Sequence, residues 1–254
     1  YEIGSGLVGS EMCIRDRIRA TPIQTEKFTW NTNVSYSTNS NKVVALSSEK
    51  FSMDQDYFYT GYTGEPIQTT THIVQVGKPI GTFYGLKSVD ITDDGLWLVE
   101  NKKGEHVLAE ETDATDWQVL GNGIPKHYLN WNNTFNFFNF DLSINMRGAF
   151  GFQIFNMRKY GMGLRGCGTD NVLRSAYLKD KDLFSSSGVI SDYFLENGSY
   201  FKLENVTLGY TFAFKSKVLE SLRLYCTAKN LFTITGYDLS LIHISEPTRP
   251  EPIS

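Results

Sequence analysis

Cysteine and long hydrophobic runs are both scarce in this sequence. The 254 residues include three cysteines, too few for a dense disulfide framework. No apolar run reaches the roughly 18 residues that a membrane-spanning helix needs. This absence does not exclude a transmembrane β-barrel, because barrel strands alternate apolar and polar residues. Aromatic residues are plentiful instead, at 14% with 22 glycines, a composition that fits a barrel.

An excess of charge of either sign is also missing. The formal net charge of −4 gives no support for nucleic acid as a partner. His72, His106 and His127 are far apart in the sequence and lack the spacing of metal ligands. No nucleophile–base pair or carboxylate pair can be assembled. We therefore predict no catalytic residue, no metal site and no cofactor, and expect that the protein is not an enzyme.

The two ends of the chain share a DNA signature. Residues 7–17 can be encoded by a DNA sequence whose reverse complement, in a shifted frame, encodes residues 239–249. That DNA resembles a transposase-type sequencing adapter. We therefore interpret residues 1–17 as a non-native or unassignable flank and residues 239–254 as a non-native flank. Residues 18–238 are then the evolved part, an internal fragment of a longer protein.

The clearest pattern lies in residues 129–156, where apolar and polar residues alternate along two segments that almost no turn separates. The apolar positions of the first segment are Leu129, Trp131, Phe135 and Phe137. Those of the second segment are Phe140, Leu142, Ile144, Met146, Phe150, Phe152 and Ile154. A period of two is the signature of a β-strand, so the pattern predicts a hairpin. Its second strand exceeds the usual length of about 5 to 6 residues, as membrane-barrel strands do.

Similar alternation marks residues 27–37, 200–214 and 222–235. The phase slips near Asn205, as a β-bulge would cause. Residues 38–42 have turn chemistry, so residues 43–46 are expected to return as a partner strand.

Glycine and proline interrupt the pattern between Gly77 and Gly81, which predicts a bend or an edge rather than a central strand. We count at least six strands in the chain. The number of strands between Thr70 and Lys126 stays open.

These segments predict an all-β protein. The expected architecture is a meander of long antiparallel hairpins with long loops at one end, which forms an incomplete transmembrane β-barrel. A half-buried hairpin of a soluble sandwich would show the same alternation, so the pattern alone leaves both open.

Residues 157–197 form a long irregular region rich in basic and aromatic side chains. Long loops without structure of their own usually bind something. We therefore select as a candidate ligand or partner loop the residues Tyr160, Arg165, Arg174, Tyr177 and Tyr193. The alternative is that these side chains pack the loop internally.

Four sequence blocks, in this order, resemble the C-terminal barrel region of the SusC/RagA family of TonB-dependent outer-membrane transporters. They are Val76-Gly-Lys-Pro-Ile-Gly-Thr-Phe-Tyr-Gly-Leu86, Phe140-Asp-Leu-Ser143, Phe201-Lys-Leu-Glu-Asn-Val-Thr-Leu-Gly-Tyr-Thr-Phe212 and Asn230-Leu-Phe-Thr-Ile-Thr-Gly-Tyr-Asp238. The similarity spans residues 18–238.

The resemblance implies a barrel of about 22 strands around a plug, set in the outer membrane of a Gram-negative bacterium. It implies energised uptake of a glycan or oligopeptide and a SusD-like surface lipoprotein as partner. The TonB complex would act through an N-terminal region missing from this fragment, which is expected to be inactive alone. The resemblance transfers no catalytic or substrate residue to a numbered position.

A soluble all-β carbohydrate-binding module is the alternative function. Such a module would be soluble and monomeric, whereas a barrel fragment should need detergent and associate through its apolar faces.

Overall fold

The computed structural model describes residues 2–3, 7–47, 53–64, 68–163, 173, 189–214 and 220–237. Strands account for 66% of the structure and helix for 6%, and the sheets are antiparallel, so the all-β prediction is confirmed. The chain divides into two compact units. Unit 1 comprises Tyr1–Met12, Ser40–Ile124 and Phe152–Asn197, and unit 2 comprises Cys13–Asn39, Pro125–Gly151 and Gly198–Ser254.

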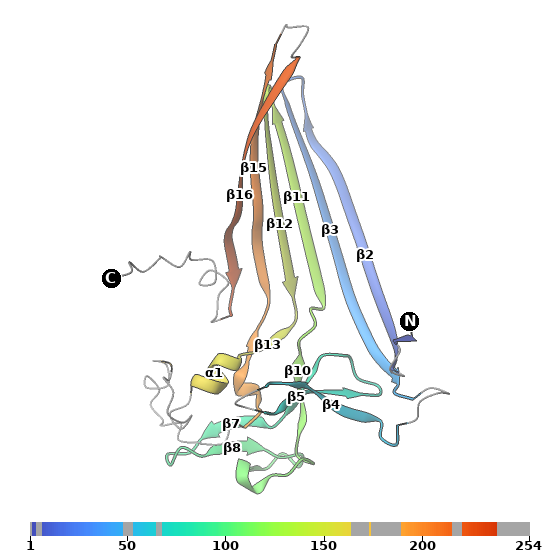
Figure 1. The fold of residues 1–254 in the computed structure, drawn as a ribbon, viewed down its shortest axis with the longest axis vertical. Helices are drawn as coiled ribbons and strands as arrows, with labels where there is room; N and C mark the ends of the chain where they lie inside the picture. Colours follow the sequence, from blue (N-terminus) through green and yellow to red (C-terminus); the bar gives the residue numbers. More distant parts are fainter. Residues whose placement is uncertain are drawn as a thin grey trace. The chain divides into compact units, whose positions relative to one another are not determined.

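The largest sheet, which supplies most of unit 2, has seven strands in the order β1-β2-β3-β11-β12-β15-β16 (Figure 1). Their bounds are Glu2–Ile3, Leu7–Gln24, Phe28–Ala45, His127–Phe137, Phe140–Phe150, Tyr200–Ala213 and Ser221–Thr235. From β3 to β16 each strand pairs antiparallel with its neighbour. The sheet is open, with β1 and β16 at its edges, so it is an incomplete barrel wall.

Strands β11 and β12 form the hairpin that the alternation predicts. Phe137 pairs with Phe140 across the turn, and Phe138 in the turn has a φ of 50°. Two-residue hairpin turns need positive φ to match the twist of the strands, which explains the abrupt connection.

Residues 38–42 do not form the predicted turn, and the separate partner strand predicted for residues 43–46 is wrong. Strand β3 continues through residues 38–45 and ends just before Leu46. The Asn39 N–H donates to the Lys126 carbonyl at 2.9 Å, and the Val43 N–H donates to the Lys78 carbonyl at 2.9 Å. Backbone partners on other segments therefore outweigh the local turn preference of Asn and Ser.

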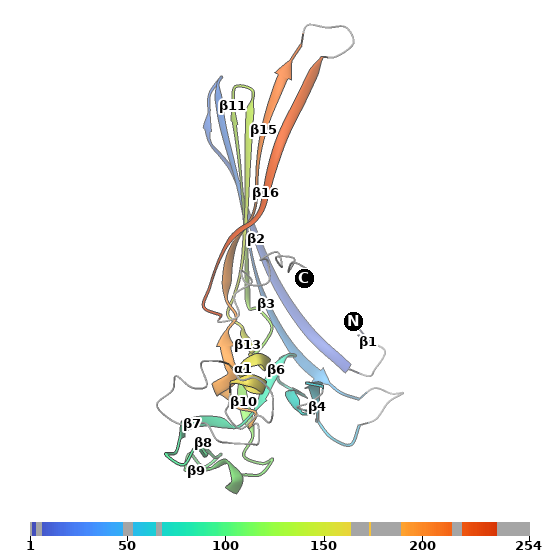
Figure 2. The same cartoon turned by 60° about the vertical axis from the view of Figure 1, so that its left-hand side comes forward.

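Unit 1 contains three smaller sheets, with the orders β10-β6-β5-β4, β7-β8-β9 and β13-β14 (Figure 2). Strands β4 to β10 are Tyr57–Tyr62, Thr70–Gln75, Thr82–Gly85, Lys87–Ile91, Trp97–Glu100, His106–Leu108 and Gln118–Asn122, and β13 and β14 are Gln153–Phe155 and Leu195–Asn197. Six strands thus lie between Thr70 and Lys126. The predicted bend is confirmed between β5 and β6, where Gly77 and Gly81 have φ of 87° and 76°.

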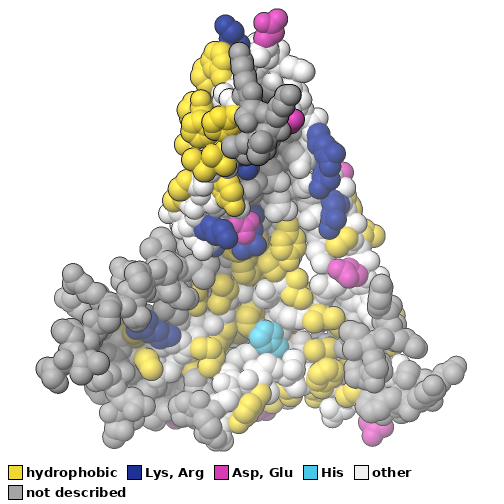
Figure 3. Space-filling view, turned by 45° about the horizontal axis from the view of Figure 1, so that its top comes forward, with side chains coloured by type: hydrophobic (Ala, Val, Ile, Leu, Met, Phe, Trp, Pro, Cys, Tyr) yellow, Lys and Arg dark blue, Asp and Glu magenta, His cyan; other side chains and the backbone are white. Residues whose placement is uncertain are grey.

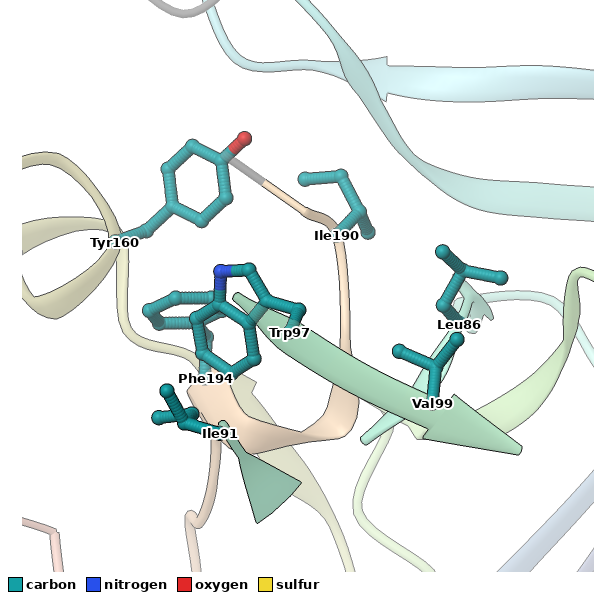
Figure 4. Packing of buried hydrophobic residues seen from close by; sticks show 7 residues of the cluster. All are labelled: Leu86, Ile91, Trp97, Val99, Tyr160, Ile190 and Phe194. Atoms are coloured by element: carbon teal, nitrogen blue, oxygen red, sulfur yellow. The ribbon is translucent and has the colours of Figure 1, made fainter. Parts of the chain in front are cut away.

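A cluster of buried side chains joins the three-stranded sheet to the short helices α1 (Met157–Met162) and η3 (Asp192–Phe194). Figure 4 shows Trp97, Phe194 and Tyr160 at its centre. The rings of Trp97 and Phe194 have centroids 5.7 Å apart, and those of Tyr160 and Phe194 are 4.9 Å apart in an edge-to-face arrangement. A second cluster contains Val43 and Val74.

Replacing Phe194 by alanine tests the first cluster. Phe194 has no exposed surface, so Phe194→Ala should cost about 3 to 5 kcal/mol of unfolding free energy by leaving a cavity. Urea unfolding of the chain in detergent, followed by tryptophan fluorescence, measures this loss. Tyr62→Ala is the control, because Tyr62 is 64% exposed. Equal losses in both variants would contradict the assignment of Phe194 to the core.

His72 predicts a pH dependence for the four-stranded sheet. Burial lowers the pKa of His72 below its ordinary value of 6.5, and its ring packs 4.3 Å from that of Phe83. Above pH 6.5 the ring is neutral in both folded and unfolded chains. Below it the unfolded chain takes up a proton first, so stability should fall as the pH drops toward the folded pKa.

Urea midpoints at about pH 7.5 and about pH 5.5 measure this effect. His72→Gln should shrink the difference between the two midpoints. His106→Gln is the control, because His106 is exposed and should leave the difference unchanged. An unchanged difference in His72→Gln would rule out His72 as the source.

Candidate functional site

One face of the seven-stranded sheet is apolar across at least five strands. Residues paired across neighbouring strands lie on the same face, so the register defines rows of side chains. One row consists of Trp30, Phe135, Leu142, Leu208 and Cys226. Another consists of Val34, Trp131, Met146, Leu203 and Phe232. The alternation seen along each strand is thus continuous from strand to strand.

Large apolar side chains on this face are open to the surroundings. Leu208 is 50% exposed and Ile234 is 64% exposed. Figure 3 shows hydrophobic side chains gathered near the top of the view. A contiguous apolar face of this kind is unfavourable in water and favourable against hydrocarbon. The face therefore suits contact with lipid.

Two polar side chains interrupt the apolar face, and tryptophans from neighbouring strands satisfy them. The Trp30 indole N–H donates to Asn133 Oδ1 at 3.1 Å, and the Trp131 indole N–H donates to Thr32 Oγ1 at 3.0 Å. Asn133 is 5% exposed. An indole N–H that meets little water needs a hydrogen-bond acceptor within the protein. Each of the two pairs therefore satisfies one donor and one acceptor on the apolar face.

The opposite face is polar and rich in amides. A row of four asparagines crosses four strands and consists of Asn33, Asn132, Asn145 and Asn205. Within it, Asn145 Nδ2 donates to Asn205 Oδ1 at 2.6 Å. The neighbouring row consists of Asn31, Thr134, Ser143, Thr207 and Thr227. Uncharged amides and hydroxyls suit a wall that faces water or a polar plug.

An ion pair spans three strands on the same polar face. Arg223 of β16 reaches across Gly209 of β15, and its Nε donates to Asp141 Oδ1 of β12 at 2.9 Å. A Cβ on Gly209 would lie 2.5 Å from Asp141 Oδ1, so only glycine leaves room for the pair. The pair thus links β12 and β16 across the strand that lies between them.

A hollow opens on the polar face beside the asparagine row. Its lining includes Arg19, Thr21, Asn31, Asn33, Asn132 and Thr134. Thr21 Oγ1 donates to Asn31 Oδ1 at 2.8 Å. Sequence reasoning missed both the row and the hollow. The signal was the period-two asparagines of residues 130–136, but only the register places them beside those of other strands.

Of the predicted ligand or partner loop, the structure describes two residues. Tyr160 is 5% exposed and packs against Phe194 in the core cluster. Tyr193 is partly buried, with its ring centroid 5.1 Å from that of Trp97. Both side chains thus pack internally. Arg165, Arg174 and Tyr177 lie outside the described residues, so a ligand role for this loop stays a prediction.

Lys159 of helix α1 contacts both Tyr193 and Glu196. Its Nζ donates to the Tyr193 carbonyl at 2.8 Å and lies 4.2 Å from the centroid of the Tyr193 ring. Glu196 Oε1 is 3.9 Å from the same nitrogen. The lysine charge is therefore engaged inside the protein.

Metal-binding clusters and membrane-spanning helices are both absent from the described residues. In that part of the chain, no three His, Cys, Asp or Glu side chains come together in a way that could hold a metal ion. Within the same residues, no helix is both long and apolar enough to cross a membrane.

The sequence matches no protein-family model, but it is similar to curated proteins. It is 26% identical to TonB-dependent receptor P3 of Formosa agariphila, over 87% of this chain and 24% of the receptor. It is 25% identical to TonB-dependent receptor SusC of Bacteroides thetaiotaomicron, over 87% of this chain and 22% of SusC. The chain thus spans about a quarter of the length of these relatives.

Solved structures show the same fold. The structure of the RagAB peptide transporter superposes with a TM-score of 0.72 and 17% identity, covering 90% of this chain and 26% of the transporter chain. The RagAB peptide importer in its "open-open" state gives a TM-score of 0.70.

The sheet defines the class: a membrane-barrel wall with an apolar outer face and a polar inner face. The relatives agree with this class: the chain is similar to TonB-dependent receptors that include SusC and has the fold of the RagAB transporter, so the predicted resemblance is confirmed. These receptors are outer-membrane proteins of Gram-negative Bacteroidetes, so the predicted localisation is confirmed as well. The relatives are receptors and transporters rather than enzymes.

Adjacent residues of β15 test the assignment of the two faces. Leu208→Arg places a charge on the apolar face and should cost about 2 to 4 kcal/mol in a bilayer. Thr207→Arg is the matched control, because Thr207 is on the polar face and bonds to Thr227 at 2.9 Å. Heat-modifiable mobility of the chain folded into lipid vesicles measures the folded fraction. A larger loss of folded fraction in Thr207→Arg than in Leu208→Arg would contradict the assignment of the two faces.

Proposed function

We propose that this chain is part of the wall of an outer-membrane TonB-dependent transporter that takes up a glycan or oligopeptide nutrient. The observation that carries the proposal is the two-faced sheet, with apolar rows on one side and an asparagine row on the other. The apolar face meets outer-membrane lipid, and the polar face lines the lumen. The fragment does not transport alone, because the sheet is open.

The partners in this proposal follow the family. A SusD-like surface lipoprotein covers the barrel, and the TonB complex supplies energy through an N-terminal region outside this chain. SusC and the RagAB importer support this assignment at the level of the family. The protein is not an enzyme and binds no nucleic acid.

We propose further that residues 18–238 are the evolved segment and that residues 1–17 and 239–254 are flanks of foreign origin. The matching DNA of the two ends motivates this division.

The alternative is a soluble all-β carbohydrate-binding module. It is disfavoured by the half-exposed Leu208 and by Ile234, which belong to the apolar face and would lie in water.

Sequencing the source DNA across residues 17–18 and 238–239 is the first step of the test. The reading frame should continue on both sides into a full-length transporter. Expressed in an outer-membrane host, that transporter should fractionate with the outer membrane and take up labelled oligosaccharide or oligopeptide. Deletion of TonB in the host is the control and should abolish uptake.

Two outcomes would contradict the proposal. The frame could begin near Ile18 and stop near Asp238, which would favour the soluble module. Uptake that is equal with and without TonB would remove the energised mechanism.

A further inference from the structure

Four aromatic rings gather on one face of the four-stranded sheet in unit 1. We call this surface the tyrosine face; it consists of Tyr57 and Tyr59 of β4, Tyr84 of β6 and Trp117 just before β10. Tyr59 is its centre, with ring centroids 5.6 Å from Tyr57, 6.0 Å from Tyr84 and 6.2 Å from Trp117. The rings of Tyr84 and Trp117 are 6.0 Å apart. Tyr59 is 41% exposed, whereas Tyr57, Tyr84 and Trp117 are partly buried and Trp117 also packs against the core cluster, so Tyr59 is the ring most open to a ligand.

The sheet beneath fixes the arrangement of the rings. Ile73, which is 2% exposed, pairs with Tyr59 across β5 and fills the space beside it. The register sets Val119 of β10 beside Tyr84. The three tyrosines stand on paired strands and each ring contacts a neighbouring ring, which limits the side-chain freedom that is lost when a ligand binds.

The tyrosine face carries no charge among the described residues. The other side chains that the register places on this face are Gln75, Ile73, Thr82, Val119 and Asn122. All five are uncharged at every ordinary pH. A ligand with ionised groups would therefore lose hydration here without gaining a partner.

Hydrogen-bonding groups lie at the edges of the rings. Within the described part of the chain, no side chain or carbonyl hydrogen-bonds to the hydroxyls of Tyr57, Tyr59 and Tyr84 or to the Trp117 indole N–H. Burial, followed by the neighbouring Tyr57, raises the pKa of Tyr59 above its ordinary value. Burial and then Tyr59 and Tyr57 raise the pKa of Tyr84. Both hydroxyls therefore stay neutral and can donate as well as accept.

We propose that the tyrosine face binds an uncharged oligosaccharide. Sugar rings combine apolar C–H faces with hydroxyl edges, which match flat aromatic rings bordered by free hydroxyls and an indole N–H. The lack of charge favours a neutral glycan over a peptide, whose termini and side chains carry charge. The inference rests on the proposed function in that it selects the glycan from the two nutrient classes.

Isothermal titration of the full chain tests this inference. The chain is held in a detergent without a sugar head group, such as a dimethylamine oxide, because a maltoside would compete for the site. The probes are neutral hexasaccharides of glucose, mannose and xylose. An oligogalacturonate of similar length and a Gly/Ser hexapeptide are the charged and peptide controls. At least one neutral hexasaccharide should bind, and the two controls should not.

Variants then locate the binding. Tyr59→Ala should weaken affinity at least about tenfold, because it removes the central ring. Tyr62→Ala is the matched control, since Tyr62 belongs to the same strand on its opposite face and is more exposed. If Tyr59→Ala loses its strand-type circular dichroism, Tyr59→Phe decides instead. This variant keeps the ring, loses the hydroxyl and should bind about 3- to 10-fold more weakly.

Three results would overturn the inference. They are no binding of any neutral hexasaccharide by the folded chain, equal binding of the peptide or the oligogalacturonate, and equal weakening by Tyr62→Ala. Failure of TonB-dependent uptake by the full-length transporter, with sugar binding intact, would instead remove the proposed function and leave the tyrosine face standing.

Discussion

Unit 2 depends on the register of backbone hydrogen bonds between its long strands. Each strand alternates two kinds of side chain, so a slip of one residue between neighbours would set apolar against polar residues. The pairings from β3 to β16 avoid this, and Trp30, Phe135 and Leu142 fall in one row while Asn33, Asn132 and Asn145 fall in another. The wall thus has two chemically different surfaces because every pairing agrees with the next.

The alternation and turn residues of the sequence predicted those parts of the fold that depend on neighbouring residues. The hairpin of β11 and β12, the bulge near Asn205 and the bend between Gly77 and Gly81 all follow from alternation or turn residues, and each is present. The prediction for residues 38–46 was wrong because their hydrogen-bond partners, Lys126 and Lys78, are remote in sequence. The asparagine row was missed for the same reason, since it exists only between strands.

Burial of aromatic residues was the least predictable property of the candidate sites. Tyr160 and Tyr193, selected as ligand residues from an irregular segment, pack against Trp97 and Phe194. Tyr59 lies outside the loop selected from the sequence, yet it is exposed on the edge strand β4. The residue type alone does not distinguish an aromatic ring that packs in a core from one that faces a ligand. Contacts between residues far apart in the sequence decide between these two environments.

The bulge in β15 adds a residue to that strand without moving the flanking side chains to the opposite face of the sheet. Glu204 has no paired residue on β12 or β16, and the register on both sides shifts by one position beside it. Without it, Leu203-Asn-Val would alternate without interruption. Against β12 the extra residue is Glu204, whereas against β16 the extra residue lies on β16 between Lys229 and Phe232, where Asn230 has a φ of 55°. Extra residues on two neighbouring strands thus leave Asn205 and Lys229 on the polar face and Leu203 and Phe232 on the apolar face, so the two chemically different sides of the wall continue across the irregularity.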